Sequence, residues 1–92
     1  MEANDFKAIL RAEGFAEAVA RSLPAGVATP MHTHEFDAKV LVTAGEFTLT
    51  KDGIATAHRP GDMFAVPAGY LHAESAGPAG VEYLSGRRQP TG

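Results

Sequence analysis

Three of the four histidines in this 92-residue chain lie in two glycine-bounded runs that are far apart in the sequence. His32 and His34 lie in the run from residue 26 to 45, and His72 ends the run from residue 61 to 72. Side chains two residues apart on a strand project from the same side of a sheet. A third histidine from a distant strand can join them if the sheet curls. The spacing therefore predicts a barrel with a site inside it.

The composition favours short strands joined by tight turns over a bundle of helices. The chain contains 10 glycines and 6 prolines, and its length suits one domain with a modest core. We therefore expect one all-β domain over residues 1–92. It is divided into a helical segment at 1–14, a β-barrel at 15–86 and a tail at 87–92.

Charge and cysteine content exclude several kinds of partner and site. The formal net charge is −3 and the basic residues are scattered, so we expect neither nucleic acid nor a membrane as partner. There is no cysteine, so any metal must be held by nitrogen and oxygen atoms. The N-terminal residues lack the basic start and apolar centre of a secretory signal, which predicts a cytoplasmic protein.

Turn signals and apolar patterns divide the chain into one short helix and seven strands. The helix is expected over residues 5–13, with Asn4 or Asp5 as its cap and Gly14 as its stop. The strands are expected over residues 15–23, 31–43, 46–51, 54–58, 63–66, 70–75 and 81–86.

Alternation along these strands predicts which side chains face inward. In the long central strand two histidines share a face with apolar residues: His32, His34, Phe36, Ala38, Val40 and Val42. The same counting places Tyr70, His72 and Glu74 on one face of a later strand. Glu74 is therefore expected near the site.

These residues resemble the two motifs of the cupin superfamily. The first motif is a glycine, five residues, His-x-His, an acidic residue and a closing glycine, and its matches here are Gly26, His32, His34 and Gly45. The second is a glycine, five residues, Pro-x-Gly, two residues and a histidine, and its matches are Gly61, Pro67, Gly69 and His72. The resemblance covers about residues 26–76 and implies a small, RmlC-like jelly-roll barrel, or double-stranded β-helix.

Two positions depart from the pattern of that superfamily. The acidic ligand of the first motif should fall at residue 38, which is Ala38, and the asparagine that follows the second motif is replaced by Ala76. Asp37 has outward parity and would need a β-bulge to turn inward. Glu74 has inward parity but comes from another strand. Either carboxylate is a candidate for the missing ligand.

The resemblance implies that His32, His34 and His72 are metal ligands. Three imidazoles with open coordination positions suit a divalent transition metal (Zn, Ni, Fe, Cu or Mn) better than Mg²⁺ or Ca²⁺. The alternative is that the three histidines line a metal-free pocket. The remaining histidine, His58, is interpreted as structural.

The expected function is that of a small metal-binding protein whose barrel cavity holds a small organic molecule. As an enzyme it would be a dioxygenase, isomerase or decarboxylase-like protein, with Glu74 and Tyr70 as candidate catalytic residues. The alternative is a non-catalytic ligand-binding or sensor module. Arg87 and Arg88 are interpreted as a solvated end, with anion binding as the alternative role.

A homodimer is expected from the start of the predicted barrel. Apolar residues lie on both faces of the first predicted strand: Phe15, Ala16, Ala18 and Val19. Pairing two sheets across a two-fold axis would bury this surface, which a chain of this length gains from.

Overall fold

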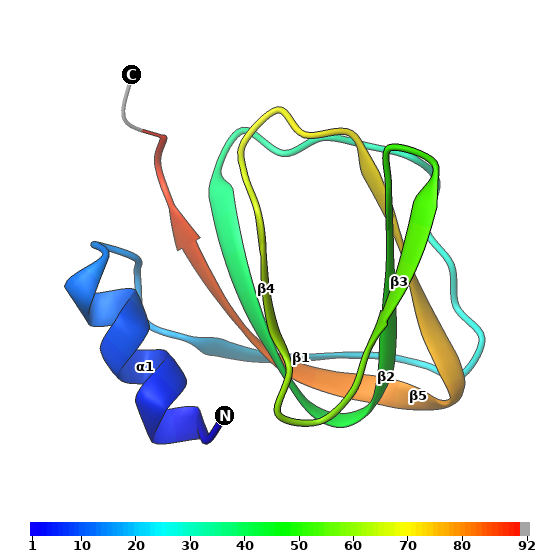
Figure 1. The fold of residues 1–92 in the computed structure, drawn as a ribbon, viewed down its shortest axis with the longest axis horizontal. Coiled ribbons are helices and arrows are strands. Elements are labelled where there is room, and N and C mark those ends of the chain that lie inside the picture. Colours follow the sequence, from blue (N-terminus) through cyan, green and yellow to red (C-terminus); the bar gives the residue numbers. More distant parts are fainter. Residues whose placement is uncertain (91–92) are drawn as a thin grey trace.

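The computed structural model describes residues 1–90 and contains one helix and five strands (Figure 1). The elements are α1 (Ala3–Ala12), β1 (Val19–Leu23), β2 (Asp37–Lys51), β3 (Ile54–His58), β4 (Met63–Val66) and β5 (His72–Arg88). All strands belong to one antiparallel sheet with the order β1-β5-β2-β3, and β4 also pairs with β2. The predicted all-β fold with a short N-terminal helix is therefore confirmed.

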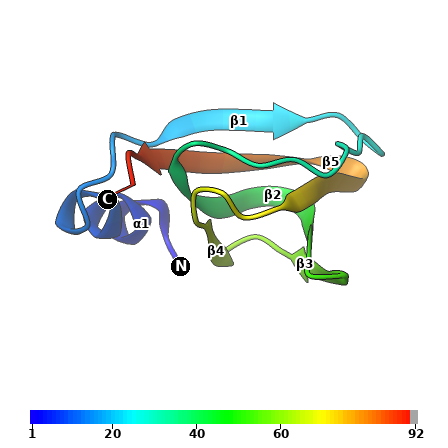
Figure 2. The same ribbon diagram turned by 90° about the horizontal axis from the view of Figure 1, so that it is seen from above.

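The two long strands β2 and β5 pair along almost their whole length and bend together. Their register runs from Asp37 opposite Arg88 to Lys51 opposite His72, with breaks near Val42 and Gly45. On its other edge β2 pairs with β4 before the bend and with β3 after it. The sheet therefore curls on itself, and Figure 2 shows β1 and β5 on one side and β3 and β4 on the other.

Several predicted strand boundaries are wrong. The predicted strands 31–43 and 46–51 form the single bent strand β2, and 70–75 and 81–86 form β5, because the ladder between them continues through the bend. Residues 31–36 lie outside β2, and residues 15–18 precede β1. The strand predicted to end at residue 86 continues to Arg88, where it pairs with Asp37.

The segment before β2 follows β5 without forming a regular strand. The backbone N–H of Thr29 donates to Glu74 at 2.8 Å, and His32 and His72 form an isolated antiparallel bridge. Pro30 lies between these contacts and has no N–H to donate, which interrupts the ladder. The segment is thus fixed beside β5 at intervals only.

Apolar side chains cover both faces of the curled sheet. The first cluster lies within the curl and comprises Val42, Phe47, Leu49, Val66, Ala76 and Val81. The second lies between α1 and the opposite face and comprises Phe6, Leu10, Phe15 and Leu41. Because Leu41 follows Val40 in β2, its side chain points away from the interior of the curl, and α1 covers it there.

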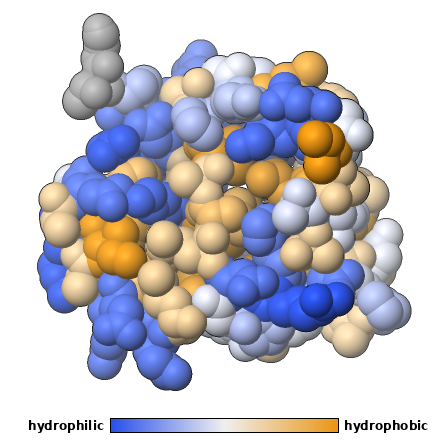
Figure 3. Space-filling model, viewed as in Figure 1, coloured by the Kyte–Doolittle hydropathy of each residue, from blue (hydrophilic) through white to orange (hydrophobic). Residues whose placement is uncertain are grey.

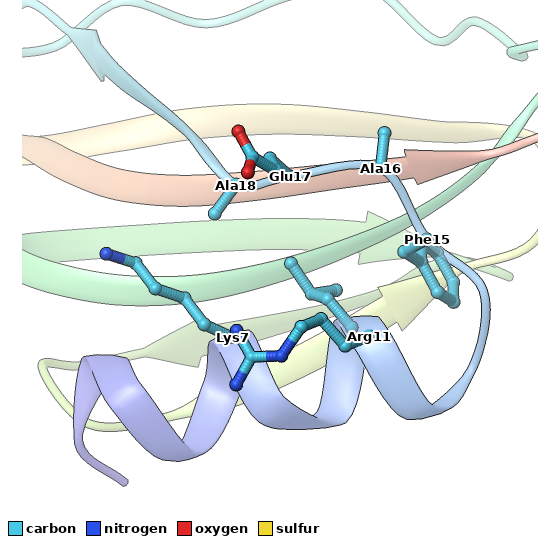
Figure 4. A pocket seen from close by; sticks show the side chains of 7 residues that line it. Lys7, Arg11, Phe15, Ala16, Glu17 and Ala18 are labelled. Atoms are coloured by element: carbon cyan, nitrogen blue, oxygen red, sulfur yellow. The ribbon is translucent and has the colours of Figure 1, made fainter.

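A surface crevice of about 240 Å³ lies between α1 and the approach to β1 (Figure 4). Lys7 and Arg11 extend along its helix side, and Ala16, Glu17 and Ala18 line the side nearer the sheet. Phe15 also lines the crevice and is buried against α1, so its apolar surface is not available to a partner. The homodimer stays a prediction; of the four residues on which it is based, Phe15 is buried and Val19 in β1 is 50% exposed.

Helix α1 has 10 residues, and no helix within residues 1–90 is long and apolar enough to cross a membrane. It spans Ala3–Ala12 rather than the predicted 5–13, a difference of the size usual at helix ends.

The bend of β2 requires glycine at position 45. Gly45 has φ +78°, and a Cβ atom there would lie 2.1 Å from the carbonyl oxygen of Gly80 in β5. Gly53 has a similar φ of +76° but open space around it. We expect Gly45→Ala to lower the free energy of unfolding by about 2–4 kcal/mol, the sum of a backbone and a packing cost. Gly53→Ala should cost about 1 kcal/mol, the backbone cost alone.

Denaturant unfolding of the two glycine variants checks this prediction. Equal losses of stability in Gly45→Ala and Gly53→Ala would show that the close approach of β2 to β5 does not depend on a missing side chain.

Asp37 ties the start of β2 to two other parts of the chain. Its carboxylate accepts the Ala68 N–H at 2.9 Å and the Arg88 guanidinium at 3.0 Å. The hydrogen bond from Ala68 and then that from Arg88 lower the pKa of Asp37 below its usual 3.8. The charged form therefore stabilises the fold above pH 3.8, and this contribution is lost as the pH falls through the lowered pKa.

We therefore expect Asp37→Asn to be less stable than the wild type at pH 7. The difference should shrink as the pH falls below 3.8, because the wild-type carboxylate then becomes neutral too. Thermal unfolding of both proteins across pH 2.5–7 measures this difference in stability. A difference that does not depend on pH would contradict the role assigned to the charge of Asp37.

Candidate metal centre

The backbone brings the three histidines of the two motifs together. His32 and His72 exchange backbone hydrogen bonds of 2.8 and 2.9 Å, so their side chains lie opposite each other. The carbonyl of His34 accepts the N–H of Gly69 at 2.9 Å, which fixes His34 against the loop before β5. The ring centroids are 4.4 Å apart for His32 and His72, and 5.0 Å apart for His34 and His72.

A carboxylate joins the three imidazoles. Possible ligand atoms of His32, His34, His72 and Glu74 all lie within 4.8 Å of one another. Glu74 projects from the same face of β5 as His72, and its Oε1 lies 3.7 Å from the His72 Nε2. Of the two candidate carboxylates, the structure places Glu74 at the histidines and holds Asp37 on Ala68 and Arg88.

Two of the histidines are held in the same tautomer by the backbone. The Nδ1 of His32 lies 2.8 Å from the carbonyl oxygen of Pro30, and the Nδ1 of His72 lies 2.8 Å from that of Tyr70. Because a carbonyl oxygen only accepts, each Nδ1 carries the hydrogen and donates it. In the neutral rings the lone pair is then on Nε2, which is a common arrangement for histidines that bind metal.

The Nε2 of His72 is buried without a hydrogen-bond partner within residues 1–90. The His72 side chain is 1% exposed, and the Oε1 of Glu74, at 3.7 Å, is beyond hydrogen-bond distance. An unpaired buried acceptor costs free energy that folding does not recover. A cation bound by this lone pair would remove that cost, so the atom fits a metal ligand.

Burial and the neighbouring imidazoles lower the pKa of His34. Burial is the largest cause that lowers its pKa, followed by the neighbouring charges of His72 and His32. Glu74 acts in the opposite direction, and Arg87 lowers the pKa further. A lowered pKa favours the neutral imidazole, whose free lone pair metal binding requires.

Three of these four residues, His34, His72 and Glu74, border a cavity of about 130 Å³ inside the curl. The apolar part of its lining comprises Phe36, Ala38, Val40, Phe64 and Val66, of which Ala38 and Val40 lie on the predicted inward face of β2. In Figure 3, hydrophobic surface lies around the centre of this face, and both hydrophilic surface and further hydrophobic patches lie farther out. A small organic molecule that is partly apolar suits such a lining.

Four polar residues of the cavity were not predicted: Arg21, Tyr83, Ser85 and Arg87. Tyr83, Ser85 and Arg87 alternate along β5, and Arg21 lies opposite Tyr83 in β1. The period-two alternation from Tyr83 could have identified this face of β5. Arg87 was assigned to the tail, but it lies in β5 with its guanidinium 4.3 Å from the Phe36 ring.

The structure does not bring Tyr70 into the cavity. The Tyr70 hydroxyl donates to the carboxylate of Asp52 at 2.8 Å, and Lys51 lies over the Tyr70 ring. Its contribution to the site is the backbone carbonyl that holds His72. The fourth histidine, His58, stacks on Phe64 at 4.3 Å outside the group of four, in accord with a structural role.

Comparisons with known proteins bear on fold and family. The structure resembles an RmlC-like cupin from Shewanella frigidimarina with a TM-score of 0.67 and 24% identity over 80% of this chain. KdgF from a Halomonas species has a TM-score of 0.66 and 25% identity over 80% of this chain. The polyketide cyclase RemF from Streptomyces resistomycificus has a TM-score of 0.70 and 22% identity over 82% of this chain. The chain spans 66%, 69% and 56% of these structures, respectively.

These likenesses confirm the jelly-roll barrel expected from the two motifs. No curated protein matches the sequence. The family described as the cupin domain matches residues 19–85, which include all five strands except the last three residues of β5. This chain therefore belongs to the cupin family.

Proposed function

We propose that this cupin binds a divalent transition metal through His32, His34, His72 and Glu74, and a small organic molecule in the adjoining cavity. The observation that carries the proposal is the buried Nε2 of His72, which has no protein partner within residues 1–90. Three further ligand atoms lie within 4.8 Å of it and of one another.

The donor set supports this class of metal. Three imidazole nitrogens and one carboxylate oxygen suit Zn, Ni, Fe, Cu or Mn, whereas Ca²⁺ and Mg²⁺ prefer oxygen ligands alone. When bound, such an ion acts as a Lewis acid toward a ligand oxygen or a water molecule. The protein contributes the orientation of two imidazoles, through the carbonyls of Pro30 and Tyr70, and a partly apolar cavity beside them.

Glu74 replaces the carboxylate expected at residue 38. Ala38 lines the cavity but has no donor atom, and the Glu74 carboxylate reaches the histidines from β5 instead. The position two residues after His72 gives Glu74 the same inward parity, so one strand supplies two of the four ligands.

Removal of His72 should abolish metal binding. We expect about one metal ion per chain in wild-type protein purified without a metal-affinity column, and almost none in His72→Ala, because the variant lacks the buried ligand atom. Elemental mass spectrometry measures the metal content of both proteins. The control His58→Ala removes a histidine outside the group and should keep its metal.

The metal proposal would be wrong if the wild type contained no metal and took up none on addition of Zn²⁺, Ni²⁺ or Fe²⁺. The three histidines would then line a metal-free pocket.

Two carboxylate variants test the fourth ligand. Glu74→Gln should weaken metal affinity by about 10–100-fold, because the amide lacks the negative charge. Asp37→Asn should leave the affinity unchanged, since that carboxylate is held by Ala68 and Arg88. Competition with a chromophoric chelator measures the affinities, and a loss confined to Asp37→Asn would identify Asp37 as the ligand instead.

A further inference from the structure

We propose that Arg21 and Arg87 make the barrel cavity a site for a small organic carboxylate. The two guanidinium groups would hold the carboxylate, and a second oxygen of the ligand would face the histidines and Glu74. This inference rests on the proposed function, because it assigns a ligand class to the cavity beside the proposed metal. It concerns residues that neither cupin motif contains.

The lining of the cavity carries two sets of polar side chains. His34, His72 and Glu74 form the first set, and Arg21, Tyr83, Ser85 and Arg87 form the second. Tyr83, Ser85 and Arg87 share a face of β5, and Arg21 lies opposite Tyr83 in the β1–β5 pairing. The second polar set is therefore built on paired strands.

The two arginines are free to bind an anion. No carboxylate within residues 1–90 lies within 4.0 Å of Arg21 or Arg87, whereas Arg59 and Arg88 each have an acidic partner. Among residues 1–90, Glu74 is the only acidic residue that lines the cavity, and it lies with the histidines. With a divalent ion bound, the positive charge of the cavity exceeds its negative charge, which favours an anionic ligand.

Arg87 is oriented before any ligand binds. Its guanidinium carbon lies 4.3 Å from the centre of the Phe36 ring, and such stacking restricts the planar group while its N–H donors stay available. A planar guanidinium can donate two parallel hydrogen bonds to a carboxylate. Arg87 is thus suited to a carboxylate more than to a neutral ligand.

Tyr83 lines the cavity near residues of both polar sets. Burial raises the pKa of its hydroxyl, the charge of Glu74 raises it further, and Arg21 and Arg87 lower it. The hydroxyl is therefore close to both the acidic and the basic groups and stays protonated at neutral pH. It can donate a hydrogen bond to a ligand that extends from the arginines toward Glu74.

The volume limits the size of the ligand. A cavity of about 130 Å³ is close to one that accepts benzene, so the enclosed part of a ligand holds on the order of six non-hydrogen atoms. A three-carbon or four-carbon acid with a second oxygen donor fits this limit. Malonate is a suitable probe, and malonamide is its uncharged counterpart of the same shape.

Calorimetric titration of malonate and malonamide into metal-loaded and metal-free protein tests the inference. We expect malonate to bind at least about tenfold more tightly than malonamide. Arg87→Gln and Arg21→Gln should each weaken malonate binding about tenfold or more, with unchanged metal content. The control Arg11→Gln removes an equal charge from α1, outside the cavity, and should bind malonate as the wild type does.

Equal affinities for malonate and malonamide, or arginine variants that bind malonate like Arg11→Gln, would overturn the carboxylate assignment. Metal content, measured separately in every sample, distinguishes this failure from failure of the metal proposal. If the wild type contains no metal and still prefers malonate, and Arg87→Gln loses this preference, the arginine site is supported and the metal proposal is wrong.

Discussion

The rest of the structure depends on the pairing of β2 with β5 through a shared bend. Gly45 and Gly80 meet there so closely that a Cβ on Gly45 would lie 2.1 Å from the Gly80 oxygen. Beyond the bend β2 takes β3 as its second neighbour, and before it β4, so the sheet closes around a cavity. Backbone contact at one point thus decides that His72 and Arg87, at opposite ends of β5, line the same space.

Local alternation predicted the inward residues well, whereas the extent of the strands was not predictable. The parity of His34, Ala38 and Val40 follows from extended backbone alone and holds although His34 lies outside β2. The end of β5 at Arg88 depends on its partner Asp37, which is 51 residues away in the sequence. A pattern confined to neighbouring residues carries no information about such a partner, which is why Arg87 was assigned to the tail.

The candidate fourth ligand, Glu74, lies on the predicted face of its strand but not at the sequence position that the motif gives for the acid. The motif places an acid at residue 38, where the side chain does face the cavity, but this chain has Ala38. An acid one residue earlier, Asp37, faces away and instead bonds to Ala68 and Arg88. Glu74 satisfies the geometric requirement from another strand because it shares the face of His72. A carboxylate therefore lies near the histidines from a different sequence position than the one in the motif.

The orientation of two imidazoles is independent of any metal. His32 and His72 each donate Nδ1–H to the carbonyl two residues earlier in the chain, Pro30 and Tyr70. Folding therefore fixes both rings and directs the protons away from Nε2, so a metal does not have to select the tautomer or order the side chains. The unpaired Nε2 of His72 is the cost of this preorganisation, and metal binding would recover it.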